Sequence, residues 1–149
     1  MISLKLVIDS NVFAKLFINE ADSEIAKSFF THCVSEDISL LAPTLFEYEL
    51  LQIALYYSYP LSEVLVQLAL YQQFNLSLIN PDKKVWLQSE VIVSDGHKNS
   101  GFPSLYDSVY HALAINNNCH FITADKRHEA KTKQFGHIVL LDQWENCWR

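Results

Sequence analysis

The sequence predicts an α/β protein in which helices cover both faces of a mainly parallel sheet. Short apolar stretches of strand length alternate with amphipathic helical stretches along the whole chain. A chain of 149 residues can bury one sizeable core. Its 3 glycines and 4 prolines are too few for long linkers or disorder. We therefore expect a single domain, residues 1–149, built as a three-layer α/β/α sandwich.

Five stretches have the length and apolar content of buried strands. They cover residues 3–9, 38–43, 76–80, 119–125 and 137–141. The first ends at Asp9 and the fourth at Asp125. Ligands of open parallel sheets bind outside the carboxyl ends of the strands, so both acids lie at the edge where function is expected.

Helices fill the segments between these strands. A short helical piece, NVFAKLFI, is followed by helices at about 23–34, 45–58, 60–73, 81–95, 104–116 and 126–135. Residues suited to cap helix N-termini stand before three of them: Asp22 or Ser23, then Thr44, then Ser104. The tail after the last strand is expected to pack onto the body through Trp144 and Trp148.

The composition excludes several classes of protein. The N-terminal apolar run is too short to span a bilayer, and it lacks the basic region and cleavage site of a signal peptide. Three widely spaced cysteines without a CxxC motif predict reduced thiols and a cytoplasmic location, without a membrane. The net charge of −6 disfavours nucleic-acid binding by bulk attraction, but it allows metal ions to bridge acids to phosphates.

Four acids stand at the edge of the predicted core: Asp9, Glu49, Asp107 and Asp125. Each has a structural explanation when it is taken alone. Asp9 and Asp125 suit caps or turns, Asp107 suits a capping box with Ser104, and Glu49 suits a helix flank that reaches solvent. Together they indicate an acidic cluster. Like charges in a cluster repel, and a hard divalent cation such as Mg²⁺ or Mn²⁺ removes that conflict. Such clusters support metal-assisted phosphodiester chemistry.

Glu47 competes with Glu49 for a place in this cluster. The spacing Thr44-x-x-Glu47 fits a capping box, in which Glu47 has a structural role. Glu49 lies beyond the first helical turn, at the border of the apolar face between Leu45 and Ile53. Capping therefore agrees with Glu49 as the member of the cluster, and the choice itself rests on the family resemblance given next, in which YEL aligns with the acid-bearing helix.

Four stretches, taken in order, resemble the PIN domain ribonucleases, in particular the VapC-like toxins of bacterial toxin–antitoxin pairs. They are VIDSNVF, APTLFEYELLQIAL, YDSVYHALA and FITADKR, and the resemblance extends from residue 7 to about residue 141. It implies a PIN-like fold, an acidic pocket at one sheet edge, and RNA as the substrate. It implies that Mg²⁺ or Mn²⁺ is held by the catalytic acids Asp9, Glu49, Asp107 and Asp125. The supporting polar residues that it implies are Ser10, Asn11 and Thr123. It also implies a homodimer and a cognate antitoxin protein that silences the enzyme.

A basic run follows Asp125. It contains Lys126, Arg127, Lys131 and Lys133. Either it grips RNA phosphates beside the metal, or it is a solvated helix face. We predict RNA contacts for Lys126 and Arg127, with Lys98 in the loop GHKNSGFPS as a weaker candidate.

The remaining aromatic and histidine residues do not indicate a site. The six histidines lack the spacing of zinc sites. His111 lies one turn after Asp107 and either faces the acidic pocket or lies on the helix surface, and we expect it on the surface. The tyrosines and tryptophans are expected in the core and at partner surfaces, with no base-stacking platform. The tyrosine- and leucine-rich helices at 45–58 and 61–72 suit either core packing, a dimer face or an antitoxin helix.

Two other functions remain open. A metal-dependent phosphohydrolase with an aspartyl nucleophile commonly has a second Asp two residues after the first, and Asn11 stands there. A non-enzymatic acidic α/β module that binds a protein partner would use the four acids as caps.

Overall fold

A computed structural model describes residues 4–96 and 100–148. It contains one five-stranded sheet with the order β3-β2-β1-β4-β5, and every strand pairing is parallel. The strands are β1 (Lys5–Ile8), β2 (Ser39–Pro43), β3 (Leu76–Ile79), β4 (His120–Thr123) and β5 (Ile138–Leu140). The predicted fold class is confirmed, with each strand shorter than the sequence pattern suggested.

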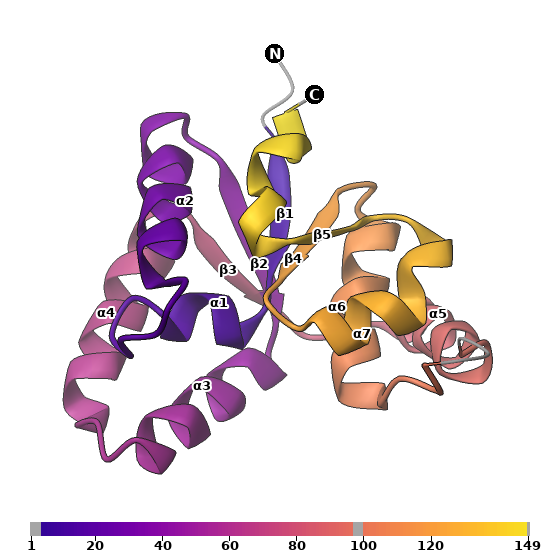
Figure 1. The fold of residues 1–149 in the computed structure, drawn as a ribbon, viewed down its shortest axis with the longest axis horizontal. Helices are drawn as coiled ribbons and strands as arrows, with labels where there is room; N and C mark the ends of the chain where they lie inside the picture. The colour runs from indigo at the N-terminus through magenta and orange to yellow at the C-terminus, as the bar shows by residue number, and fades with distance from the viewer. Residues whose placement is uncertain (1–3, 97–99, 149) are drawn as a thin grey trace.

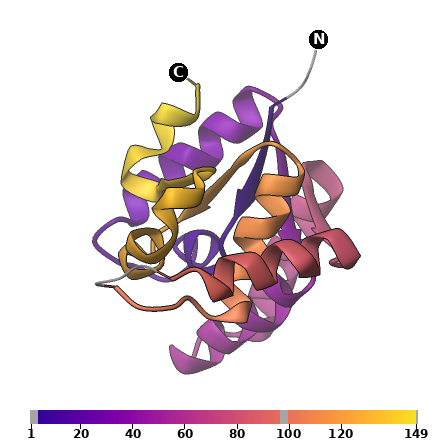
Figure 2. The same cartoon turned by 90° about the vertical axis from the view of Figure 1, so that its right-hand side faces the viewer.

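Helices cover both faces of this sheet. They are α1 (Ser10–Ala14), α2 (Ser23–Ser35), α3 (Leu45–Tyr56), α4 (Leu61–Phe74), α5 (Lys83–Ser94), α6 (Leu105–Asn116) and α7 (Lys126–Thr132). Short 3-10 segments follow at η1 (Lys133–Phe135) and η2 (Leu141–Trp148). Helices α1 to α4 lie on one side of the sheet and α5 to α7 on the other (Figure 1). Figure 2 shows α5 and α6 side by side over the second face. No helix within the described residues is long and apolar enough to cross a membrane.

The strand order places a topological switch between β1 and β4. From β1 the chain steps outward to β2 and β3, and it then returns to the other side of β1 as β4. Loops that leave β1 and β4 therefore diverge in opposite directions, which opens a crevice at their carboxyl ends. This crevice is the expected binding site of a doubly wound sheet.

The core is apolar on both faces of the central strand. Leu6, Val7 and Ile8 of β1 are all fully buried, which explains why an unbroken apolar run predicted this strand. On the side of α1, the ring of Phe13 meets Phe30 edge-on at a centroid distance of 5.7 Å. Burial of such aromatic side chains supplies much of the hydrophobic stabilisation.

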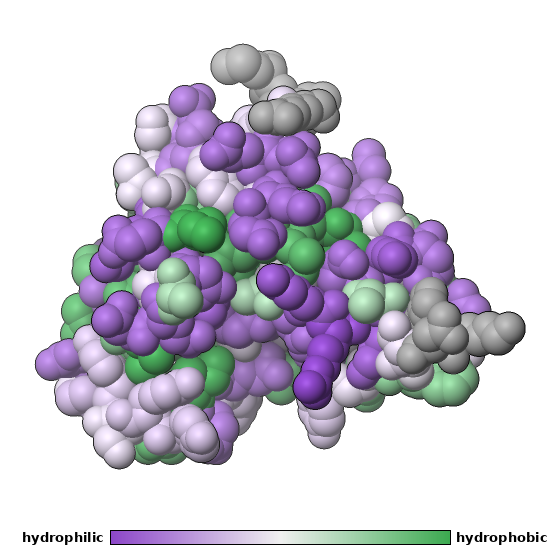
Figure 3. Space-filling model, in the orientation of Figure 1, coloured by the Kyte–Doolittle hydropathy of each residue, from purple (hydrophilic) through white to green (hydrophobic). Residues whose placement is uncertain are grey.

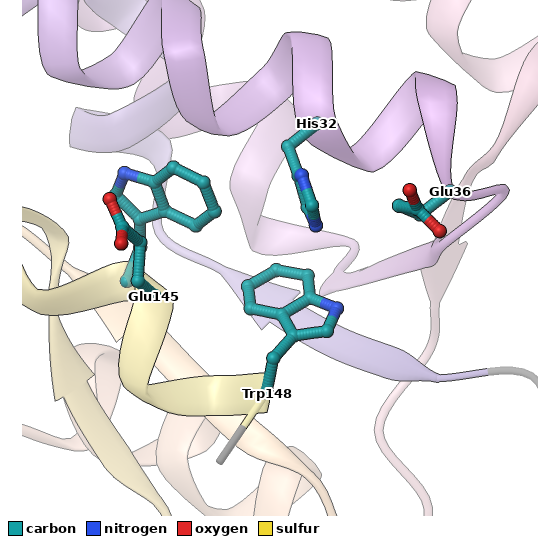
Figure 4. A pocket seen from close by; sticks show the side chains of 5 residues that line it. His32, Glu36, Glu145 and Trp148 are labelled. Atoms are coloured by element: carbon teal, nitrogen blue, oxygen red, sulfur yellow. The ribbon is translucent and has the colours of Figure 1, made fainter.

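The C-terminal segment packs onto α2, as predicted. The ring of Trp144 lies 5.8 Å from that of Phe29, and the ring of His32 lies 4.6 Å from that of Trp148. Figure 4 shows His32 pointing from α2 toward Trp148. A surface hollow of about 480 Å³ opens beside these rings.

The cap at Ser104 is confirmed. Its hydroxyl accepts a hydrogen bond from the backbone N–H of Asp107 at 3.1 Å. The predicted cap at Thr44 is wrong, because Thr44 already has helical backbone angles and its side chain makes no cap hydrogen bond. The capping box with Glu47 therefore does not form.

The predicted cap of α2 is also wrong. Asp22 occupies the N-cap position without a side-chain cap bond. The hydroxyl of Ser23 instead accepts from the N–H of Glu20 and donates to the carbonyl of Ile18. It therefore shapes the turn that precedes the helix.

Candidate active site

The loops after β1 and β4 meet at the switch point of the sheet. The N–H of Asp9 donates to the carbonyl of Ile122 at 3.0 Å, which continues the strand pairing by one residue. Two residues on, the side-chain carbonyl of Asn11 accepts from the N–H of Ala124 at 3.3 Å. These bonds hold the two loops, and the acids they carry, at one edge of the sheet.

Asp9 is the most deeply buried acid of the group, with 6% of its surface exposed. Its carboxylate accepts hydrogen bonds from the hydroxyls of Thr123, at 2.8 Å, and Ser10, at 3.4 Å, and it makes no cap bond to α1. Burial raises the pKa of Asp9 to about 7, although the bond from Thr123 lowers it. Three further contributions to this raised pKa come from the charges of Asp107, Glu49 and Asp125. The cap explanation for Asp9 is therefore wrong.

Glu49 reaches the same edge from α3. Its Oε1 accepts hydrogen bonds from the hydroxyl of Tyr110, at 2.6 Å, and from that of Ser10, at 3.4 Å. Burial raises the pKa of Glu49, the bond from Tyr110 lowers it, and the charge of Asp107 raises it. The Ser10 hydroxyl thus stands between Glu49 and Asp9 and has one proton to donate to either.

Asp107 lies in the first turn of α6, half-buried. Burial raises its pKa, and so does the charge of Asp125. The cap bond from its N–H to Ser104 and the positive charge of Lys131 both lower the pKa. Asp107 therefore belongs to the same electrostatic group as the other acids, in addition to its place at a helix start.

Asp125 caps helix α7, which is the structural role considered for it in the sequence analysis. Its Oδ1 accepts hydrogen bonds from the N–H groups of Arg127 and His128, at 3.0 and 3.1 Å, and so caps α7. Its charge nevertheless raises the pKa values of both Asp9 and Asp107. Only one oxygen is used in the cap, so capping and membership of the acidic group are compatible.

Sequence comparison places this arrangement in a known family. The sequence matches the PIN domain over residues 6–134, which is most of the chain. This chain belongs to the PIN domain family. No curated protein matches it.

Two solved structures have a similar fold. The crystal structure of VapC20 from Mycobacterium tuberculosis, a toxin that cleaves the sarcin–ricin loop, superposes with a TM-score of 0.65 and 12% identity. The match covers 84% of this chain and 93% of that one. A toxin–antitoxin complex from Klebsiella pneumoniae gives a TM-score of 0.64 and 17% identity, over 91% of this chain and 97% of that one. At these identities the likeness concerns the fold.

Sequence reasoning did not single out Tyr110 of this PIN domain. The side chain is fully buried, and its hydroxyl is the closest hydrogen-bond donor to Glu49. Burial, together with the charges of Asp9 and Glu49, raises the pKa of Tyr110, so the hydroxyl keeps its proton. The available signal was its position on α6, three residues after Asp107 and therefore on a neighbouring part of the same helix surface.

His111 does not lie on the helix surface, and that prediction is wrong. It is fully buried, and its Nε2 donates to the carbonyl of Gly136 at 2.6 Å. Burial lowers the pKa of His111 to about 4, so the ring is neutral. The physical reason is that α6 is covered on all sides, since every residue from Ser108 to Ala114 is buried.

The predicted RNA contacts lie beside the acids. Lys126 and Arg127 are exposed in the first turn of α7, directly after Asp125. Lys131, one turn further along, is close enough to affect the pKa of Asp107. Lys98 lies outside the described residues.

The donor set suits a hard cation. Among the described residues, no three Asp, Glu, His or Cys side chains already converge as ligands of one ion. Charge repulsion acts over longer distances than coordination, and it raises the pKa values of Asp9, Glu49 and Asp107. A divalent cation that drew these carboxylates inward would remove this repulsion, and carboxylate oxygens are the ligands that Mg²⁺ and Mn²⁺ prefer.

Replacement of Tyr110 by Phe tests how this group is held. The change keeps the ring in the core but removes the hydrogen bond to Glu49, and we expect Mn²⁺ affinity to fall roughly 10- to 100-fold. Mn²⁺ titration by calorimetry measures this. Tyr71→Phe is the matched control, because Tyr71 lies in the aromatic core against Phe13 rather than beside the acids. Equal Mn²⁺ affinity in wild type and Tyr110→Phe would show that this hydroxyl does not orient a ligand.

Proposed function

We propose that this PIN domain is a metal-dependent endoribonuclease and the toxin of a toxin–antitoxin pair. The observation that carries the proposal is the group of four acids at one sheet edge, three of which have pKa values raised by burial and by one another. Membership of the PIN family and a fold shared with VapC20 and with a toxin–antitoxin complex support it.

In the proposed site, Mg²⁺ or Mn²⁺ is held by Asp9, Glu49, Asp107 and Asp125. Such a cation lowers the pKa of water and neutralises charge that develops on the phosphate. Ser10 and Thr123 hold the Asp9 carboxylate by donating hydrogen bonds to it. Asn11 accepts from Ala124, which fixes its amide and leaves the amide N–H groups to orient water or substrate.

No side chain of the chain has to act as a nucleophile. A water molecule attacks the RNA phosphodiester in line, and one of the carboxylates accepts its proton. The P–O bond to the ribose oxygen opposite the attacking water breaks, and that oxygen leaves with a proton taken from solvent. A phosphohydrolase with an aspartyl nucleophile, the rival function, commonly has a second Asp at position 11. Asn11 stands there, and its carbonyl oxygen is already used by a backbone N–H.

A matched pair of glutamates on α3 tests the proposal. Structured RNAs are incubated with the full chain, with Mg²⁺ or with EDTA, and the fragments are resolved on a gel. We expect cleavage with Mg²⁺, none with EDTA, loss in Glu49→Gln and retention in Glu47→Gln. Glu49 accepts hydrogen bonds from Tyr110 and Ser10. Glu47 lies in the first turn of the same helix, where the expected capping box with Thr44 does not form. Cleavage that survives EDTA, or that fails equally in both variants, would contradict the proposal.

Replacing Lys126 and Arg127 by Ala is expected to weaken RNA binding and to flatten its salt dependence. Each phosphate contact that is lost removes about 0.7–0.9 from the slope of log K against log salt. Binding is measured by fluorescence anisotropy at several salt concentrations. The double variant Lys83→Ala/Lys84→Ala, in the exposed first turn of α5, serves as the control for the loss of two positive charges alone. An unchanged slope in the double variant would remove both residues from the RNA footprint.

The antitoxin and a second copy of the chain are the proposed protein partners. Helices α3 and α4 expose large apolar side chains, and hydrophobic and weakly polar surface gathers over them at the lower left of Figure 3. These side chains include Leu55, Tyr56, Leu65, Val66, Leu70 and Phe74, and Tyr57, directly after α3, adds another. Apolar faces of this kind accept amphipathic helices.

Light scattering over a range of concentrations tests the dimer. A short reading frame upstream that encodes a DNA-binding antitoxin would distinguish a toxin from another PIN nuclease.

A further inference from the structure

The surface hollow between α2 and η2 lies at the opposite edge of the sheet from the acids. It has a volume of about 480 Å³ and is lined by His32, Glu36, Trp144, Glu145 and Trp148. Glu36 lies in the turn that leads from α2 into β2, and the first residue of β2, Ser39, pairs with Lys5 at the start of β1. In both views of the fold, η2 ends at the edge where β1 begins (Figure 1). Asp9 follows the other end of β1, so the hollow is separate from the acidic group.

Three aromatic rings form the walls of this hollow. The ring planes of Trp144 and Trp148 are nearly perpendicular, at 86°, with their centroids 5.4 Å apart. The ring of His32 stands at 88° to that of Trp148 and at 47° to that of Trp144. Both tryptophans are half-buried, so part of each indole remains at the surface. Aromatic rings that stand in different planes suit alkylammonium groups, which the negative ring faces attract from more than one side.

Two glutamates complete the lining. Figure 4 shows Glu36 and Glu145 on opposite sides of His32 and the ring of Trp148. Both carboxylates are exposed, and the ion pairs within the described part of the chain involve neither of them. No lysine or arginine of the described residues lines the hollow. The described lining therefore combines negative charge with aromatic faces, and both attract cations.

We propose that the hollow binds an aliphatic diamine or polyamine, with one ammonium group at each glutamate and the hydrocarbon chain across the indole rings. Each ammonium group is attracted by a carboxylate and by the face of an indole, and the methylene groups leave water against apolar ring surface. Two carboxylates disfavour a ligand that carries phosphate. The volume of about 480 Å³ lies within the roughly 300–1,000 Å³ of small-molecule sites. This site goes beyond the proposed nuclease function and does not depend on it.

Tryptophan fluorescence and calorimetry provide the test, with 1,4-diaminobutane as the probe in metal-free buffer. The chain has 3 tryptophans, so Trp86→Phe leaves those of η2 as the only indoles. We expect a saturable change of their fluorescence, and calorimetry on the wild-type chain should give one diamine per chain. Butylamine has a single ammonium group and should bind roughly two- to fivefold more weakly, because it pairs with one carboxylate only.

The double variant Glu36→Gln/Glu145→Gln removes both carboxylates. Both side chains are exposed, so the fold should be unaffected, and diamine affinity should fall roughly 4- to 25-fold. Glu63→Gln/Glu90→Gln is the matched control for the loss of two negative charges, because these exposed acids lie on α4 and α5, away from the hollow. The control variant should bind the diamine as the wild type does.

Replacement of Trp148 by Leu tests the aromatic wall. Leucine keeps an apolar side chain against the core but removes the indole, so diamine affinity should fall roughly 2- to 30-fold. Trp148→Phe retains an aromatic face and should lose less. Melting temperatures confirm that each variant folds.

Four results would overturn this site. Equal affinity for butylamine and 1,4-diaminobutane would remove the second ammonium contact, and equal losses in the two double variants would mean attraction by net charge alone. Loss of binding in Asp9→Asn would place the diamine at the acidic group instead. Arg149 follows Trp148 in sequence and lies outside the described residues. A gain in affinity of more than about tenfold in Arg149→Gln would mean that the chain's own guanidinium occupies the hollow.

Discussion

Replacement of Asp9 by Asn is expected to abolish RNA cleavage and yet to stabilise the metal-free protein at pH 7. Asn keeps the shape and still accepts a hydrogen bond from Thr123, but it removes a negative charge from a site that is 6% exposed. The rise of the Asp9 pKa from 3.8 to about 7 corresponds to about 4 kcal/mol at neutral pH. The weaker hydrogen bond from Thr123 offsets about 1–2 kcal/mol of this gain.

The expected net gain of about 2–3 kcal/mol corresponds to a rise in melting temperature of roughly 4–10 °C. Cleavage should fall more than about 100-fold, beyond the loss seen when an outer partner of a metal ligand is removed. Thermal scans in EDTA and gel assays with Mg²⁺ measure the two effects. Asp142→Asn, an exposed acid on η2, controls for a change of net charge.

A lower melting temperature for Asp9→Asn in EDTA would mean that ionised Asp9 is well accommodated without a cation. Cleavage within tenfold of wild type would mean that Asp9 does not hold the metal. Both outcomes together would leave only the structural roles of the four acids, and would favour the non-enzymatic reading of the fold.

The strands and the sheet edge were predictable because they depend on local composition. An unbroken apolar run that ends in a polar residue is typical of a buried parallel strand, and β1 and β4 both follow this pattern. Parallel pairing then brings the residues after these strands together without further information. The positions of Asp9 and Asp125 therefore followed from short stretches of sequence.

Other features were not predictable because they depend on packing between distant segments. The bond from Tyr110 to Glu49 joins residues 61 apart in sequence. His111 was assigned to the surface because a single helix does not reveal that α5 covers one side of α6 and the sheet another. Thr44 is a residue type that often caps helices, but its backbone angles are already helical, so its side chain does not cap α3. The order of residue types in the sequence does not reveal these backbone angles.

Stabilisation by Mn²⁺ is expected to be small at pH 5 and large at pH 7.5. In the folded metal-free protein the pKa of Asp9 is about 7, and the pKa values of Glu49 and Asp107 are also raised. At pH 5 the folded site therefore keeps at least the Asp9 proton, and a cation must displace it in order to bind. At pH 7.5 that proton is mostly lost, and the repulsion between the carboxylates is greater than at pH 5. The cation therefore binds more tightly at pH 7.5 and removes more of this repulsion.

Without metal, the stability of the folded protein also depends on pH. A raised pKa on Asp9 makes the folded state lose stability as pH rises from about 4 to about 7, because the unfolded chain has already released that proton. Buried His111 and His128, with pKa values lowered to about 4, act in the opposite direction up to about pH 6.5. The difference between melting temperatures with and without Mn²⁺ at each pH cancels the histidine contribution, because the ion does not need these two rings.

At pH 7.5, and with Mn²⁺ at about 100 times its Kd, the gain should be about 2.7 kcal/mol, or roughly 5–10 °C in melting temperature. Glu47→Gln should show the full gain, and Asp9→Asn should lose most of it at every pH. An Mn²⁺ effect of equal size at pH 5 and pH 7.5, or one that survives in Asp9→Asn, would place the ion elsewhere. In that case Asp9 and its neighbouring acids would not be the ligands of the ion.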